Sequence, residues 1–109
     1  MTSQSVVLRD ISDAQGTRYL GASLNSDGEL VIEGQDLGSG VDEIYGFYEY
    51  EWAWTIRARD VPKLLRALQA KPDVLSALSK RFAGDRADEL QSFLDSQGIP
   101  YEVWGRIGD

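Results

Sequence analysis

The chain contains neither cysteine nor histidine. Without cysteine it can form no disulfide and no thiolate metal site, and a reducing compartment such as the cytoplasm is its natural setting. Without histidine it lacks the commonest general base, the commonest zinc ligand and the usual side chain that changes charge near neutral pH. Nucleophilic triads that depend on histidine or cysteine are therefore excluded.

Long hydrophobic runs are also missing. No apolar stretch approaches the roughly 20 residues that a membrane-spanning helix needs, and the first residues, 1–4, do not have the charged and apolar regions of a signal peptide. We therefore expect a soluble, cytoplasmic protein that does not bind membranes. The 109 residues are expected to form one domain, 1–109, with a core large enough to fold without disulfides.

Positive charge is absent from the middle of the chain, between Arg18 and Arg57. The acidic residues in that interval are Asp27, Glu29, Glu33, Asp36, Asp42, Glu43, Glu49 and Glu51. The net charge of the chain is −7, which disfavours nucleic acid and attracts cationic partners, or serves only to keep the protein soluble. Between Arg57 and Arg86 basic residues predominate, and they indicate a solvated helix face or, alternatively, a surface for an acidic partner.

The most regular stretch runs from Tyr48 to Arg57, where two unlike sets of side chains alternate. One set is Tyr48, Tyr50, Trp52, Trp54 and Ile56, and the other is Glu49, Glu51, Ala53, Thr55 and Arg57. This period of two predicts a strand with an aromatic face toward the core and an acidic face toward solvent. Trp52 and Trp54 are expected to pack in the core, and Tyr45, Phe47 and Tyr48 to form surface contacts.

The segments before this stretch predict further strands and one shaped loop. Ser5–Asp10 and Thr17–Leu24 have strand patterns, and Asn25–Gly28 is a turn that joins the second strand to a third at Glu29–Glu33 in a hairpin. Gly34–Gly46 contains four glycines among 13 residues and is expected to be a loop or bulged connection. It matches only part of a dinucleotide-binding fingerprint, so phosphate binding is not expected.

Three apolar stripes at helical spacing follow the aromatic strand. They consist of Val61, Leu64, Leu65 and Leu68; of Val74, Leu75, Leu78 and Phe82; and of Ala87, Leu90, Phe93 and Leu94. Asp60 and Asp85 are placed to cap the first and third helices, and 71–73 starts the second. The aromatic tail 101–104 is expected to pack on the core or to add an edge strand, with 105–109 frayed.

Strands followed by helices predict an α+β fold, with an antiparallel sheet of about four strands and about three C-terminal helices packed on one face. The opposite face would present Glu49, Glu51 and Thr55, joined by Glu29 and Glu33 if the strands pair in that register. No arrangement of residues predicts a catalytic site, a metal site or a cofactor, and the flanking glutamates make base stacking on the aromatic strand unfavourable.

Three motifs resemble a group of small bacterial proteins of uncharacterised activity. They are Glu33-Gly34-Gln35-Asp36-Leu37-Gly38, Glu49-Tyr50-Glu51-Trp52 and the helix start Asp60-Val61-Pro62. The resemblance covers most of the chain and implies no particular activity. In general character, the small, acidic, cysteine-free domain is also similar to immunity proteins that neutralise bacterial toxins.

These observations favour a non-enzymatic protein-interaction domain, most concretely an immunity-type inhibitor of a basic toxin such as a nuclease. The expected partner-binding residues are Asp36, Asp42, Glu43, Tyr45, Phe47, Tyr48, Glu49 and Glu51. One alternative is an enzymatic or ligand-binding domain that uses carboxylates of the glycine-rich loop, with or without a bound Mg²⁺ or Ca²⁺ ion. Another is a structural or regulatory homodimer that pairs through an edge strand or the helical face.

Overall fold

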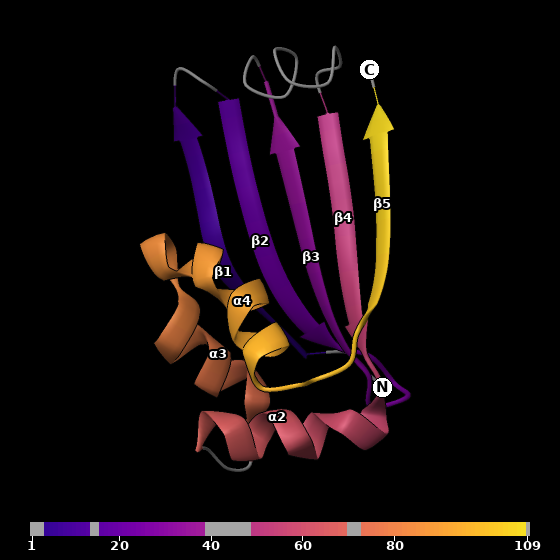
Figure 1. Cartoon of the computed structure of the whole chain (residues 1–109). Coiled ribbons are helices and arrows are strands. Elements are labelled where there is room, and N and C mark those ends of the chain that lie inside the picture. The colour runs from indigo at the N-terminus through magenta and orange to yellow at the C-terminus, as the bar shows by residue number, and fades with distance from the viewer. Residues whose placement is uncertain (1–3, 14–15, 39–48, 70–72, 109) are drawn as a thin grey trace.

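The computed structural model describes residues 4–13, 16–38, 49–69 and 73–108, and within them the fold is α+β, as predicted. Its strands are β1 (Gln4–Asp13), β2 (Gly16–Leu24), β3 (Leu30–Leu37), β4 (Glu49–Ile56) and β5 (Glu102–Gly108). They form one antiparallel sheet in the order β1-β2-β3-β4-β5, so each strand pairs with the strand before and after it in the chain (Figure 1).

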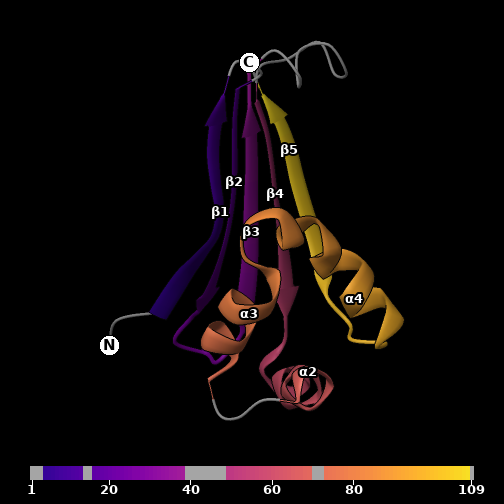
Figure 2. The same ribbon diagram turned by 90° about the vertical axis from the view of Figure 1, so that its left-hand side faces the viewer.

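The helices lie between β4 and β5 in the chain and on one side of the sheet (Figure 2). They are the 3₁₀ turn η1 (Ala58–Asp60), α2 (Val61–Leu68), α3 (Val74–Phe82), the 3₁₀ turn η2 (Gly84–Glu89) and α4 (Leu90–Ser96). Their apolar stripes and one face of the sheet bury a single core. It consists of Leu8, Leu20, Ala22, Leu30, Ile32, Trp54, Ile56, Leu64, Leu68, Val74, Leu75, Leu78, Phe82, Ala87, Leu90, Leu94 and Ile99.

The predicted aromatic strand is confirmed as β4. Trp54 and Ile56 are buried against the helices, and Trp52 packs against the same core while remaining partly exposed. Glu49 and Glu51 have the opposite parity and lie on the face away from the helices, which we call the outer face. The β3–β4 register also places Glu33 on this face, opposite Ala53.

The predicted hairpin between β2 and β3 is confirmed, and one side chain organises its turn. The Oδ1 atom of Asn25 accepts hydrogen bonds from the backbone amides of Asp27 and Glu29, both at 3.0 Å. Gly28 has φ of 81°, a left-handed conformation that glycine adopts without steric cost.

The prediction that a loop begins at Gly34 is wrong for residues 34–37, which continue β3 and pair with β4. A strand interior normally disfavours glycine, but here Gly34 gives room to the ring of Trp52. A Cβ atom on Gly34 would lie 2.0 Å from Cζ2 of Trp52. The rest of the predicted loop lies outside the described residues except for Gly38.

Two further predictions about the C-terminal half need correction. The tail does add an edge strand, but residues 105–108 are not frayed, because they pair with 49–52 of β4. Asp60 occupies the N-cap position of α2 without a capping hydrogen bond, and Asp85 lies in η2, one turn before α4 begins. The predicted start of the second helix is confirmed, since Asp73 Oδ1 accepts a hydrogen bond from the amide of Ser76.

Trp52 lies between Gly34 and Gly105 in the sheet register, and these two glycines make a matched pair of test sites. We predict that Gly34→Ala lowers the free energy of unfolding by about 1–3 kcal/mol, because the new methyl group would overlap the indole ring. Gly105→Ala should cost much less, since its nearest neighbour would be 3.7 Å away. Urea unfolding followed by circular dichroism measures both values.

The Trp52→Ala background tests the cause of this effect. If ring overlap is responsible, Gly34→Ala should be nearly neutral once the indole ring is gone. An equal loss of stability in both backgrounds would show that the backbone of Gly34, and not the ring above it, imposes the glycine.

Candidate functional site

The sheet separates the predicted partner-binding residues that the structure describes. Glu49 and Glu51 lie on the outer face, whereas Asp36 pairs with Tyr50 in the register and shares its helix-side face. Asp36 therefore does not join the outer carboxylates, although sequence proximity suggested a single acidic surface. The remaining candidates, Asp42, Glu43, Tyr45, Phe47 and Tyr48, lie outside the described residues.

On the outer face the two glutamates share one cation, Arg106 of β5. Its Nη2 atom is 2.9 Å from Oε1 of Glu51 and 3.8 Å from Oε1 of Glu49, and Gln35 donates a hydrogen bond of 2.9 Å to Glu49 Oε2. A hydrogen bond with Glu49 is the largest cause that lowers the pKa of Glu51, followed by the hydrogen bond from Arg106. The sequence-based view missed Arg106 because it treated residues 105–109 as frayed.

The outer face also has exposed apolar side chains. Trp104 of β5 is 53% exposed and Val7 of β1 is 52% exposed. In the register Trp104 stands next to Ala53, which is followed across the sheet by Glu33. The helices of the described chain all lie on the other side, so no described helix covers this face (Figure 2).

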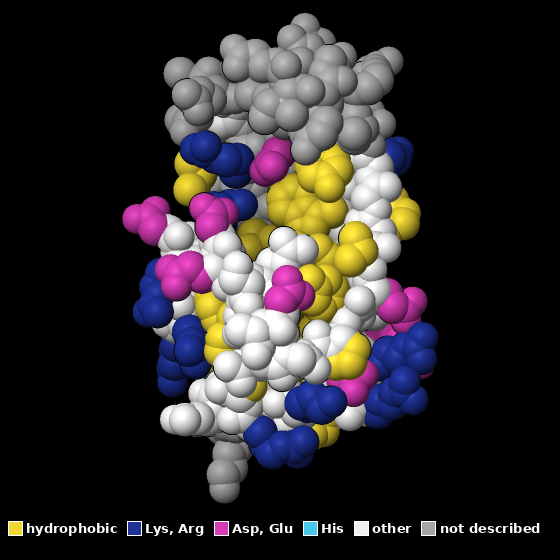
Figure 3. Space-filling view, in the orientation of Figure 1, with side chains coloured by type: hydrophobic (Ala, Val, Ile, Leu, Met, Phe, Trp, Pro, Cys, Tyr) yellow, Lys and Arg dark blue, Asp and Glu magenta, His cyan; other side chains and the backbone are white. Residues whose placement is uncertain are grey.

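The helix-side face has a cleft where the sheet extends beyond η2 and α4. Figure 3 shows hydrophobic side chains gathered over β3, β4 and β5 there, beside basic and acidic groups. The cleft has a volume of about 360 Å³. It is lined by Arg9, Leu20, Asp36, Tyr50, Trp52, Trp54, Ala87, Asp88, Gln91 and Val103.

The floor of the cleft is aromatic. Tyr50 and Trp52 stack on one another with ring centroids 5.4 Å apart and planes inclined by 26°. Trp54 continues the row and contacts Tyr101, whose hydroxyl donates a hydrogen bond of 2.7 Å to Asp95. Burial and this hydrogen bond raise the pKa of Tyr101.

Three polar atoms at the cleft are buried without a hydrogen-bond partner in the described chain: Arg9 Nε, Asp36 Oδ1 and Trp52 Nε1. Buried polar groups are normally paired, so three such atoms around one cleft distinguish it from the rest of the surface. Desolvation by burial raises the pKa of Asp36, against the opposing influence of Arg9 and Arg18.

Arg9 reaches the cleft because of a register shift in β1. The shift lies between Val7 and Arg9, and it leaves Leu8 without a partner on β2. Leu8 is buried in the core, and the guanidinium of Arg9 forms an ion pair with Asp88 of η2. Sequence reasoning missed Arg9 because it lies in an apolar run whose simple alternation the bulge interrupts.

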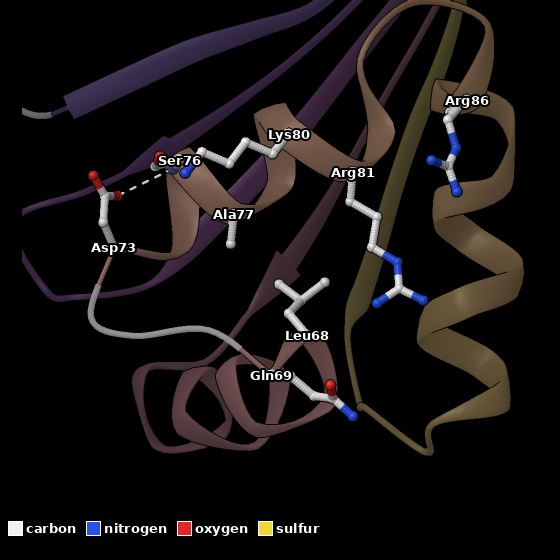
Figure 4. Close-up of a pocket in the computed structure, with 8 residues that line it drawn as sticks. All are labelled: Leu68, Gln69, Asp73, Ser76, Ala77, Lys80, Arg81 and Arg86. Atoms are coloured by element: carbon white, nitrogen blue, oxygen red, sulfur yellow. Dashed lines mark hydrogen bonds between the residues drawn. The ribbon is translucent and has the colours of Figure 1, made fainter.

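A wider recess of about 690 Å³ lies among the helices. Its lining residues are Leu68, Gln69, Asp73, Ser76, Ala77, Lys80, Arg81 and Arg86 (Figure 4). Lys80 extends along α3 away from Arg81, and the Arg81 guanidinium lies 4.5 Å from the ring centroid of Phe93. The basic side chains thus diverge, as expected for a solvated helix face.

Comparison of the chain with protein-family models, curated proteins and solved structures finds no match. Among the described residues, no group of three or more acidic side chains is arranged to hold a metal ion, and no helix is long and apolar enough to cross a membrane.

The raised pKa of Asp36 predicts that the difference in stability between wild type and Asp36→Asn depends on pH. Because the folded state binds this proton more tightly than the unfolded state, Asp36 lowers stability increasingly as pH rises from the unfolded pKa, near 3.8, through the raised folded pKa. Asp36→Asn should therefore raise the melting temperature at pH 7, and the gain should shrink on acidification below that range.

Melting curves of wild type, Asp36→Asn and Asp85→Asn over a range of pH measure this difference. Asp85 is exposed on η2 and provides a control with the same loss of charge. A lower melting temperature for Asp36→Asn at pH 7 would mean that the attraction of Arg9 and Arg18 outweighs desolvation.

Proposed function

We propose that this chain is a non-enzymatic protein-interaction domain whose partner binds the outer face of the sheet. In its most concrete form, it is an immunity-type inhibitor that covers a basic site on a toxin such as a nuclease. The observation that supports this proposal is an open sheet face that combines the exposed Trp104 with the carboxylates of Glu33, Glu49 and Glu51.

The size of this face suits a protein partner. Five strands spaced about 4.8 Å apart, with about eight residues rising about 3.3 Å each, give a surface of about 24 by 26 Å. The resulting planar area, about 600 Å², approaches the roughly 800 Å² that each partner contributes to a standard interface. Residues beside the face would supply the remainder.

The side chains of the face supply both anchoring and charge. Tryptophan is among the residues that most often dominate the binding energy of an interface, and Trp104 is exposed at the edge of the open face. Among the described residues of this face are five carboxylates and two arginines. They are Asp10, Glu33, Glu49, Glu51, Glu102 and Arg106, together with Arg57, which follows β4 and pairs with Glu102.

The ion pairs of the face order its carboxylates. Arg106 holds Glu49 and Glu51, and Arg57 Nε lies 2.9 Å from Oε1 of Glu102. The remaining excess of negative charge would attract a basic partner over several ångströms and accelerate the encounter, most strongly at low salt.

Trp104→Ala tests the anchor. Tagged wild type and Trp104→Ala are each used to pull down proteins from a lysate of the source organism, first at low and then at moderate salt. Wild type should retain one basic protein that the variant does not retain. The dissociation constant of the purified partner should rise by about 30-fold or more, as expected for a hot-spot residue. Val103→Ala is the matched control, since Val103 neighbours Trp104, is 67% exposed and lies on the opposite face. Equal retention by both variants would exclude the outer face as the interface.

Glu33→Lys tests the charge. Stopped-flow mixing with the partner should show slower association and a weaker dependence on salt, because the substitution reverses a charge on the open face. Asp85→Lys makes the same change on the helical side and should leave the rate almost unchanged. Equal slowing by both variants would mean that only net charge matters, and not the position of the carboxylate.

A further inference from the structure

We infer that the cleft on the helix-side face is a binding site for a neutral, planar nitrogen heterocycle of the nucleobase class, held by Arg9, Asp36 and Trp52. The site lies on the side of the sheet opposite the proposed interaction face. Either assignment can therefore fail without affecting the other.

The floor of the cleft suits a flat ring. The indole of Trp52 lies against the backbone of Gly34, where no Cβ atom separates them, and Tyr50 stacks beside it. Aromatic side chains of this kind are the usual platforms on which proteins stack bases, because every base has a π face. The sequence alone disfavoured such stacking because Glu49 and Glu51 flank the rings, but the register places both glutamates on the opposite face of the sheet. The cleft volume of about 360 Å³ is at the small end of the range for ligand pockets, about 300–1,000 Å³, and fits a compact ligand.

A ligand that reaches the buried polar atoms of Arg9, Asp36 and Trp52, through small rotations of these lining side chains, must both accept and donate hydrogen bonds. Arg9 Nε and Trp52 Nε1 are buried donors, and Asp36 Oδ1 is a buried atom that accepts when the carboxylate is ionised. A purely apolar ligand would leave all three unpaired, which is costly in a buried site. Nucleobases present carbonyl or ring-nitrogen acceptors next to N–H donors in one plane, and this combination complements the set.

The charges around the cleft favour a neutral ligand. The charges of Arg9 and Arg18 lower the pKa of Asp36, and the charge of Asp88 raises it. Arg9 also forms an ion pair with Asp88. These four groups comprise two cations and two carboxylates, so an added charge would have no uncompensated counterion among them. This balance argues against phosphate or a cationic side chain as the main recognised group, and in favour of the ring itself.

The test is an NMR titration of the ¹⁵N-labelled chain with uridine, cytidine and guanosine. Trp52 contributes one of three indole N–H signals, which Trp52→Phe identifies. We expect at least one nucleoside to shift the Trp52 signal in a saturable manner, while the Trp104 signal on the outer face stays in place. If uridine binds, the dissociation constant of 3-methyluridine should be at least about 10-fold higher than that of uridine, because 3-methyluridine lacks the N3–H donor for Asp36.

Two variants examine the polar contacts. Arg9→Lys retains the charge but removes Nε, and Asp36→Ala removes the carboxylate; each should weaken binding about 10-fold. The native spectrum of each variant confirms that it has folded. The inference is overturned if no nucleoside shifts the Trp52 signal, or if toluene shifts it as strongly as the nucleosides do, since the cleft would then be only a hydrated or apolar surface.

Discussion

The contact between the Trp52 indole and the backbone of Gly34 is the constraint on which the other features of the helix-side face depend. It occurs within the β3–β4 register, so it fixes Asp36 opposite Tyr50 and Gln35 opposite Glu51. Because the indole ring lies against the backbone of β3 at Gly34, it forms part of the floor of the cleft. The same orientation buries its Nε1 atom without a partner in the described chain.

The two-residue period of the strands divides the acidic middle of the sequence into two different environments. On the outer face, Glu49 and Glu51 remain accessible and are neutralised in part by Arg106. On the other face, Asp36 is partly desolvated beside aromatic rings, and burial shifts its pKa upward. Neighbouring carboxylates in one sequence thus lie in opposite environments, since one set is paired with a cation at the surface and the other is partly desolvated.

Local signals in the sequence were sufficient to predict β4, the β2–β3 hairpin and the three apolar helical stripes, because each depends on residues close in the chain. The continuation of β3 through Gly34 could not be predicted, since glycine usually indicates a loop and only the ring of Trp52 explains it. The approach of Arg9 to the cleft depends on the bulge in β1 and on Asp88 in η2, 79 residues away. The ordering of 105–108 depends on pairing with β4 across the intervening helices.

The position of β5 in the chain also determines how the sheet is completed. The first four strands form a meander in which every pairing is between neighbours, and such local contacts close rapidly. One edge of the aromatic strand β4, however, stays unpaired until all three helices and then β5 have been synthesised. During that interval β4 presents a row of free amides and carbonyls beside Trp52 and Trp54, which is a template for pairing with another chain. β5 pairs with residues 49–55 along this edge, so it covers the backbone groups of the aromatic strand that would otherwise be free.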